Sequence, residues 1–287
     1  MDHAVVAVTS TEQAAAPFQK LGLRVSDPIR HEGIGSESRM IFAGERPEQS
    51  FYIELFGIID EAKARATGRG PYLDAVARGG GLTRLMLKTS GLPSVAERLR
   101  ARGLASNVEE ISFGGRKSSD LVTLTGVPDL AIEAGLFEPV MNDADVFERR
   151  KANGSFQHDF PLKRVDHLAA MAPDIEAATK FWGEALGVPV HGEIRGPGII
   201  IRQLKMGDSI LELLAPDGPE SRLPGRPPGL MSMVAFEVPK LDEAVALARD
   251  RGFSPSEPAG GILPGTRTST IPGGELAGLG LQMLEYV

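Results

Sequence analysis

The sequence predicts an α+β protein in which one strand–helix–strand unit occurs four times. The clearest copy begins with the strand Val165 to Met171, continues through a helix to Gly187 and ends in the strand Ile210 to Leu214. In every copy, the residue at the place of His167 lies 19 or 20 residues before a helix-ending glycine. These four residues are His3, Arg84, His167 and Met233. Self-similarity at a constant spacing is the signature of a repeat architecture.

Each predicted helix ends at a glycine. The four glycines, each followed by an apolar residue, are Gly22, Gly103, Gly187 and Gly252. Glycine just past a helix adopts the left-handed conformation without a Cβ clash, so it is a common helix stop. The third helix has apolar residues at intervals of three and four, which is typical of a buried helix face. We therefore interpret Phe181 and Trp182 as core residues and not as a ligand-stacking pair.

The first two copies follow each other in the first half of the chain. The first runs from the strand at His3, through a helix over about 11–21, to the strand Phe51 to Phe56. The second begins with the strand Leu82 to Leu87, and its last strand is expected over Leu130 to Glu133. The third copy carries Gly207-Asp208 between two apolar runs, which indicates a hairpin.

The length of 287 residues predicts two domains of about 140 residues each. Residues 139–162 are polar and charged and lack strand alternation, so we interpret them as the linker. The first domain is then expected over 1–138, with units 1–58 and 80–138. The second is expected over 163–287, with units 163–216 and 229–287.

Composition excludes several classes of protein. A net charge of −7 and a pI near 5.4 disfavour a nucleic-acid partner, because binding phosphates needs clustered Lys and Arg. No basic-then-apolar leader and no apolar span of membrane length is present, so no membrane partner and a cytoplasmic location are expected. The absence of cysteine excludes disulfides and thiolate metal sites.

The residues at both ends of the repeat carry a family resemblance. A strand–helix–three-strand unit with Asp-His-Leu or Asp-His-Ala at its start and Ile-Glu-Leu or Leu-Glu-Leu in its final strand resembles the βαβββ module of the vicinal oxygen chelate superfamily. That group includes glyoxalase I, methylmalonyl-CoA epimerase, extradiol dioxygenases and bleomycin resistance proteins. The resemblance implies that the modules pair, first with second and third with fourth. Each pair would curl into a cup-shaped, eight-stranded mixed sheet with helices outside.

The resemblance also implies where a site would lie. In the superfamily a metal ion inside the cup is held by residues from the first and the last strand of each module. The corresponding residues of the first cup are His3, Glu54, Arg84 and Glu133. Those of the second cup are His167, Glu212, Met233 and Gln282.

These residues lead to different expectations for the two cups. In the first, His3, Glu54 and Glu133 are expected to hold Zn²⁺, Mn²⁺, Ni²⁺ or Fe²⁺. Arg84 cannot ligate a cation, so it either acts on the substrate or closes the site as an ion-pair network. The second cup is expected to be metal-free, because Met and Gln replace ligands there. No nucleotide cofactor is expected, since the glycine pair at 33–35 lacks a third glycine that opens a helix.

Three function classes remain open. The first is a glyoxalase-like or epimerase-like lyase or isomerase, in which the metal or Arg84 polarises a carbonyl while Glu54 or Glu133 moves a proton. The second is a metal-free protein that binds a small molecule or confers resistance. The third, a ring-cleaving dioxygenase, is disfavoured because its iron needs two histidines and a glutamate in one cup. In each case the partner is a small molecule, and a homodimer is one option for the assembly.

Overall fold

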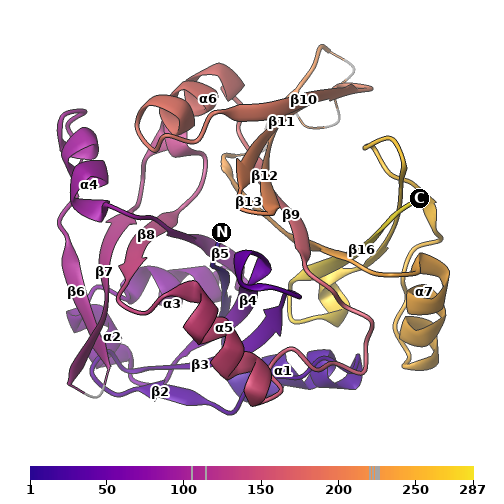
Figure 1. The fold of residues 1–287 in the computed structure, drawn as a ribbon, viewed down its shortest axis with the longest axis horizontal. Helices are drawn as coiled ribbons and strands as arrows, with labels where there is room; N and C mark the ends of the chain where they lie inside the picture. The colour runs from indigo at the N-terminus through magenta and orange to yellow at the C-terminus, as the bar shows by residue number, and fades with distance from the viewer. Residues whose placement is uncertain (105, 114, 220, 222, 224–226) are drawn as a thin grey trace. The chain divides into compact units, whose positions relative to one another are not determined.

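The strands form two eight-stranded mixed sheets, as the repeat and the family resemblance predicted. The computed structural model (Figure 1) describes residues 1–104, 106–113, 115–219, 221, 223 and 227–287. The strand orders are β2-β3-β4-β1-β5-β8-β7-β6 in one sheet and β10-β11-β12-β9-β13-β16-β15-β14 in the other. The second order repeats the first with every strand number raised by eight, so the α+β class and the pairing of modules are confirmed.

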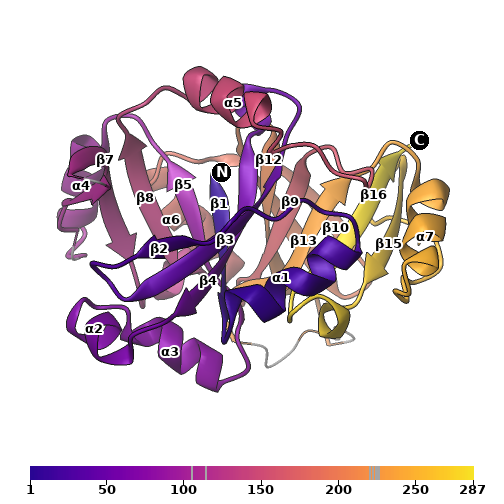
Figure 2. The same ribbon diagram turned by 90° about the horizontal axis from the view of Figure 1, so that it is seen from below.

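The first sheet is built from modules one and two. Module one contains β1 (His3–Val8), α1 (Thr11–Lys20), β2 (Ile29–His31), β3 (Ser36–Ala43), the 3₁₀ turn η1 (Pro47–Gln49) and β4 (Phe51–Ile58). Two connecting helices follow it, α2 (Glu61–Ala66) and α3 (Gly70–Ala77). Module two contains β5 (Gly81–Lys88), α4 (Leu92–Arg100), β6 (Glu109–Phe113), β7 (Arg116–Leu124), η2 (Pro128–Leu130) and β8 (Ala134–Pro139). Figure 2 shows α2 and α3 side by side, and α3 packs against β1 and β4.

The second sheet is built from modules three and four. The polar segment before it contains α5 (Asp143–Ala152). Module three contains β9 (Val165–Met171), α6 (Ile175–Glu184), β10 (Val190–Gly196), β11 (Ile199–Met206) and β12 (Ser209–Pro216). Module four contains β13 (Gly229–Glu237), α7 (Leu241–Asp250), β14 (Ala259–Gly260), β15 (Thr266–Ile271), η3 (Gly273–Glu275) and β16 (Gly280–Tyr286). The predicted hairpin at Gly207-Asp208 joins β11 to β12.

The predicted helix stops are confirmed. Gly22, Gly103, Gly187 and Gly252 all have φ between 75° and 86°. At three of these ends, the N–H of the glycine donates a hydrogen bond to a carbonyl in the last turn of the helix. At the end of α1, for example, Gly22 donates to the Gln19 carbonyl at 2.9 Å. Trp182 and Phe181 are buried, in agreement with their interpretation as core.

The predicted last strand of module two is wrong in position. Pro128–Leu130 forms a short 3₁₀ turn, and β8 begins only at Ala134. Ala131 adopts a left-handed conformation (φ 63°), which ends the turn and redirects the chain before the strand starts. Apolar content alone suggested a strand at 130–133, whereas Pro128 and Asp129 favour a turn there. Glu133 consequently lies immediately before β8 and not inside it.

Residue contacts divide the chain into two compact units that each combine distant parts of the sequence. The His3 unit contains His3–Thr83, Arg149–Asp166 and Ser232–Val287. The His167 unit contains Met1–Asp2, Arg84–Glu148 and His167–Met231. The domain boundaries near 138 and 163 stay a prediction.

Inside each unit, the ends of two helices are joined by hydrogen bonds. In the His3 unit, Lys20 donates to the Gly252 carbonyl at 3.4 Å, and Arg251 donates to the Leu21 carbonyl. Each cation thus caps the carboxyl end of the other helix, α7 or α1, where unpaired carbonyls favour positive charge. In the His167 unit, Arg98 of α4 donates to the carbonyl of Ala185 at the end of α6 at 3.2 Å.

None of the helices in the described part of the chain combines the length and the apolar character needed to cross a membrane.

We predict that Gly80→Ala lowers the free energy of unfolding more than Gly79→Ala. Both glycines join α3 to β5 and have positive φ, 70° and 108°, so either alanine is strained by about 1–2 kcal/mol. A Cβ at Gly80 would also lie 2.5 Å from the Ala7 carbonyl oxygen of β1, whereas a Cβ at Gly79 meets nothing within 4 Å. We expect that clash to add about 1–3 kcal/mol in urea unfolding. Equal losses in the two variants would contradict the close approach to β1.

Candidate active site on the first sheet

The central feature is a histidine–glutamate pair on neighbouring parallel strands. β1 pairs with β4 so that His3 lies opposite Tyr52 and Val5 opposite Glu54. Because side chains alternate along a strand, residues two apart share a face, and His3 and Glu54 therefore point the same way. The distance from His3 Nε2 to Glu54 Oε2 is 3.5 Å, and the two side chains are 11% and 14% exposed.

A serine and a second histidine extend this pair across the sheet. Ser38 on β3 donates its hydroxyl hydrogen to Glu54 Oε1 at 2.6 Å. Ser38 Oγ also lies 3.2 Å from Nε2 of His31, the last residue of β2. Burial lowers the pKa of His31, an effect opposed by Glu54 and reinforced by Arg69. The order of side chains is thus His31, Ser38, Glu54 and His3.

Aromatic rings hold the His3 end of this row. The Tyr52 ring stacks on the His3 imidazole with centroids 4.3 Å apart and planes inclined by 15°. Phe42 packs against Tyr52, and the Arg150 guanidinium lies 4.6 Å from the Phe42 centroid and 5.2 Å from that of Tyr52. Arg150 also donates to Ser50 at 3.3 Å. Packing of this kind restricts the orientation of the His3 ring, and cation–π contacts add to it.

Two residues that follow α5, His158 and Phe156, contact Phe42 of the aromatic cluster. His158 Nε2 lies 2.7 Å from the Phe42 carbonyl oxygen, and His158 Nδ1 lies 2.9 Å from the Arg24 backbone nitrogen. The carbonyl can only accept and the N–H can only donate, so the imidazole is neutral with its hydrogen on Nε2. Burial is the main cause of the lowered pKa of His158. Phe156 meets the Phe42 ring edge-on at 6.0 Å.

The second sheet repeats the pair in a looser form. His167 Nε2 lies 3.9 Å from Glu212 Oε2. β9 and β12 have the same register as β1 and β4, since Ala169, two residues after His167, lies opposite Glu212. The donor to Glu212 Oε1 is here the amide of Gln203, at 3.1 Å. Both pairs therefore combine one imidazole with a carboxylate whose second oxygen is held by a neighbouring strand.

In the other two modules, the strand register shows which residues occupy the places of His3 and Glu54. In module four, Ala235 lies opposite Gln282, so Met233 and Gln282 do hold the places of His3 and Glu54. In module two, Met86 lies opposite Gly135, so the place of Glu54 belongs to Gly135 and not to Glu133. A Cβ at Gly135 would come within 2.5 Å of the Met86 side chain, which fills this space. Glu133 therefore lies two residues before this position, although Gly135 follows Arg84 by as many residues as Glu54 follows His3.

Arg84 and Glu133 have local partners in the His167 unit. Arg84 Nη2 lies 3.4 Å from Thr125 Oγ1, and Glu133 Oε1 accepts from the Gly126 N–H at 3.0 Å. Glu133 Oε2 is buried and makes no hydrogen bond with the described residues. His3 and Glu54 belong to the His3 unit. Convergence of all four side chains stays a prediction.

Of the three predicted metal ligands, His3 and Glu54 lie in the His3 unit. Among the residues that the structure describes, no group of three or more His, Asp or Glu side chains is placed to hold a metal ion. A catalytic zinc site usually has three protein ligands. The pair by itself is therefore one donor short of such a site.

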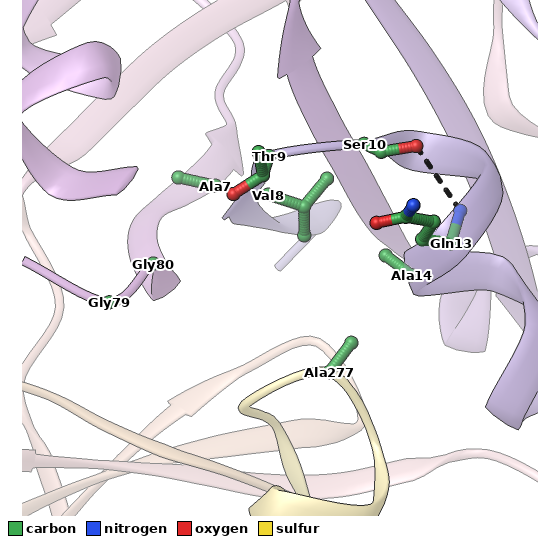
Figure 3. Close-up of a pocket in the computed structure, with 9 residues that line it drawn as sticks. All are labelled: Ala7, Val8, Thr9, Ser10, Gln13, Ala14, Gly79, Gly80 and Ala277. Atoms are coloured by element: carbon green, nitrogen blue, oxygen red, sulfur yellow. Dashed lines mark hydrogen bonds between the residues drawn. The ribbon is translucent and has the colours of Figure 1, made fainter. Parts of the chain in front are cut away.

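A separate cavity of about 260 Å³ lies at the amino end of α1 (Figure 3). Ser10 caps the helix there by accepting a hydrogen bond from the Gln13 N–H at 3.3 Å, and Gly79, Gly80 and Ala277 line the opposite side. None of the residues predicted for the first cup is among those that line this cavity.

Sequence reasoning identified His3 and Glu54 but missed several of their neighbours. Tyr52 could have been found, because it lies two residues before Glu54 and therefore on the same face. Ser38 and His31 depend on the pairing of β2, β3 and β4, and Arg150 comes from the linker helix. No local pattern in the sequence connects these segments.

Comparisons with known proteins agree with this architecture. Residues 1–125 match a family model described as a glyoxalase-like domain, and residues 166–268 match the glyoxalase/bleomycin resistance protein/dioxygenase superfamily model. The chain is similar to mitochondrial methylmalonyl-CoA epimerase from Mus musculus, with 32% identity over 99 residues, 31% of this chain and 56% of that protein. The Homo sapiens protein of the same name is 31% identical over 90 residues, 29% of this chain and 51% of that protein. The match thus spans about half the length of each relative.

A solved structure has a similar fold over the whole chain. It is a mutant of 4-hydroxymandelate synthase from Streptomyces coelicolor, with a TM-score of 0.66 and 15% identity. The match covers 100% of this chain and 92% of that one. At this identity the likeness establishes the fold and not the activity.

We predict that the wild-type protein loses stability in mild acid through His158. The folded pKa of His158 lies below its ordinary value of 6.5, so the unfolded chain takes up the proton first as pH falls. The stabilisation is complete above about pH 6.5 and is lost as pH falls toward the folded pKa. Urea unfolding across this range should show a smaller pH dependence in His158→Gln. If the pH dependence of unfolding were the same in His158→Gln as in the wild type, the neutral His158 ring would not stabilise the segment after α5.

Proposed function

The chain belongs to the vicinal oxygen chelate superfamily, and we propose from this membership that it is an enzyme that moves a proton on a carbon atom next to a carbonyl group. The proposed substrate is a small molecule, and the proposed reaction is of the isomerase or lyase type. The similarity to methylmalonyl-CoA epimerases supports this, because inverting such a carbon centre requires breaking and re-forming a C–H bond. The observation that carries the proposal is the His3–Glu54 pair on β1 and β4.

Glu54 is the proposed base. Its Oε1 accepts the Ser38 hydrogen bond, while Oε2 is turned toward His3 and is the oxygen available to a substrate C–H group. Removing that proton leaves an enolate, whose negative charge must be stabilised. An N–H of His3, beside the base and fixed by the stacked Tyr52 ring, can donate to the enolate oxygen. Return of the proton to the carbon completes the reaction without net charge transfer.

Arg84 and Glu133 keep the roles that the family resemblance suggested, as proposals. Glu133 would be a second carboxylate for proton transfer, and its buried Oε2, without a hydrogen bond from any described residue, supports such a role. Arg84 would bind the enolate or a substrate carboxylate through its planar guanidinium group.

A divalent metal ion is also proposed, on His3 and Glu54 with Glu133 as the third ligand. When bound, such an ion would act as a Lewis acid on the substrate carbonyl. The two donors that the structure brings together do not form a complete site, so the steps above depend only on the side chains.

We predict that Glu54→Gln strongly slows proton exchange while Glu212→Gln does not. Methylmalonyl-CoA in ²H₂O is the first probe, followed by other CoA thioesters, and deuterium at the carbon next to the carbonyl is measured by mass spectrometry. Loss of the base should reduce the rate by about 10²–10⁴-fold. Glu212→Gln is the matched control, because it changes the same kind of pair on the second sheet. Equal losses of exchange rate in both variants would contradict the placement of the active site on the first sheet. If the wild-type protein exchanges no thioester, the proposed reaction is contradicted.

We predict that the wild-type protein retains added Mn²⁺ or Zn²⁺ after desalting, and that Glu54→Ala and Glu133→Ala each lose the ion. Glu212→Ala, the control, should retain it. Elemental analysis of the folded variants measures the metal content. If Glu133→Ala retains the ion, Glu133 is not a ligand. If the wild-type protein retains no ion, the proposed metal site is wrong and the reaction depends only on the side chains.

A further inference from the structure

The hydrogen bonds around Ser38 have only one consistent direction. A serine hydroxyl has a single hydrogen, and an ionised carboxylate only accepts. The 2.6 Å contact with Glu54 Oε1 therefore uses the Ser38 hydrogen, at a length typical of a bond to a charged acceptor. Ser38 Oγ must then accept from His31 Nε2 at 3.2 Å. This requires that His31 carries a hydrogen on Nε2.

The tautomer of His31 thus decides where the serine hydrogen points. With the hydrogen on Nδ1, His31 Nε2 becomes an acceptor, and the freely rotating Ser38 hydroxyl can turn from Glu54 to His31. Glu54 Oε1 would then lose its donor. The pair on the second sheet has no such alternative, because the Gln203 amide that donates to Glu212 always carries its own hydrogens.

The charged groups that act on His31 come from two other elements. Glu54 on β4 favours the protonated ring, and Arg69, just before α3, disfavours it. Both the neutral Nε2–H form and the imidazolium donate to Ser38, so the serine hydrogen stays directed at Glu54 in either state. The Nδ1–H tautomer is the one form that breaks the chain of hydrogen bonds.

We propose that His31 is a positioning residue for Glu54, acting through the hydroxyl of Ser38. Its Nε2–H directs the Ser38 hydrogen to Glu54 Oε1, which fixes the orientation of the carboxylate and leaves Oε2 for the reacting carbon. This role rests on the proposed function of Glu54 as the base. Neither His31 nor Ser38 follows from the ligand positions that the family resemblance supplies.

The first test reads the tautomer without any substrate. Long-range ¹H–¹⁵N spectra of the full chain, labelled at histidine, distinguish the two imidazole nitrogens, and the signals of His31 are those lost in His31→Gln. We expect the Nε2–H tautomer at neutral pH in the wild type and a mixture of tautomers in Ser38→Ala. A predominant Nδ1–H tautomer in the wild type would overturn the inference, whatever the activity.

The second test separates positioning from mere packing. His31→Gln keeps an N–H that can donate to Ser38, whereas His31→Leu keeps the bulk and loses the donor. In the deuterium-exchange assay we expect His31→Leu to lower kcat by about tenfold with little change in KM, and His31→Gln to restore most of the loss. Circular dichroism and thermal unfolding verify that both variants fold.

The outcomes distinguish this inference from the proposed function. Wild-type activity in His31→Leu, or no rescue by His31→Gln, overturns the positioning role and leaves Glu54 as the base. No exchange by the wild type overturns the proposed reaction, and the tautomer measurement then decides alone whether His31 controls the Ser38 hydroxyl.

Discussion

The parallel pairing of the first and last strand in each module is the constraint on which the site depends. In β1–β4 and β9–β12, the residue two positions after the histidine lies opposite the glutamate. Side-chain alternation then brings imidazole and carboxylate to one face, 3.5 Å apart in the first pair and 3.9 Å in the second. A shift of one residue would turn one partner of each pair to the opposite face. Backbone hydrogen bonds therefore set the chemistry of the site.

The two pairs differ in what surrounds them. Glu54 accepts from a serine whose hydroxyl can rotate, and His3 is packed beneath an aromatic ring. Glu212 accepts from a glutamine amide of fixed polarity. A stacked ring limits the motion of the imidazole. The first pair thus combines a rotatable hydroxyl donor to the glutamate with a histidine stacked on an aromatic ring.

The sheets and the compact units group the four modules differently, which the repeat in the sequence does not show. Each sheet joins consecutive modules, whereas each compact unit joins distant ones, with helices α1 and α7 in one unit and α4 and α6 in the other. In both units, cationic side chains donate hydrogen bonds between these helices to carbonyls at helix ends, which carry partial negative charge. Arg150 of α5 and His158, which follows this helix, contact the aromatic cluster beside His3.

The sequence by itself determined the four modules and the glycines that end their helices, because these features follow from periodicity and local backbone sterics. The resemblance to the superfamily then implied the two histidine–glutamate pairs. Only the tertiary structure decided that Gly135 and not Glu133 holds the fourth position, and that His31 and Ser38 lie beside Glu54. Spacing alone allowed both residues at that fourth position, because Glu54 lies 51 residues after His3 and Gln282 lies 49 residues after Met233. Register is fixed by hydrogen bonds between strands far apart in the chain, which no local pattern of residues records.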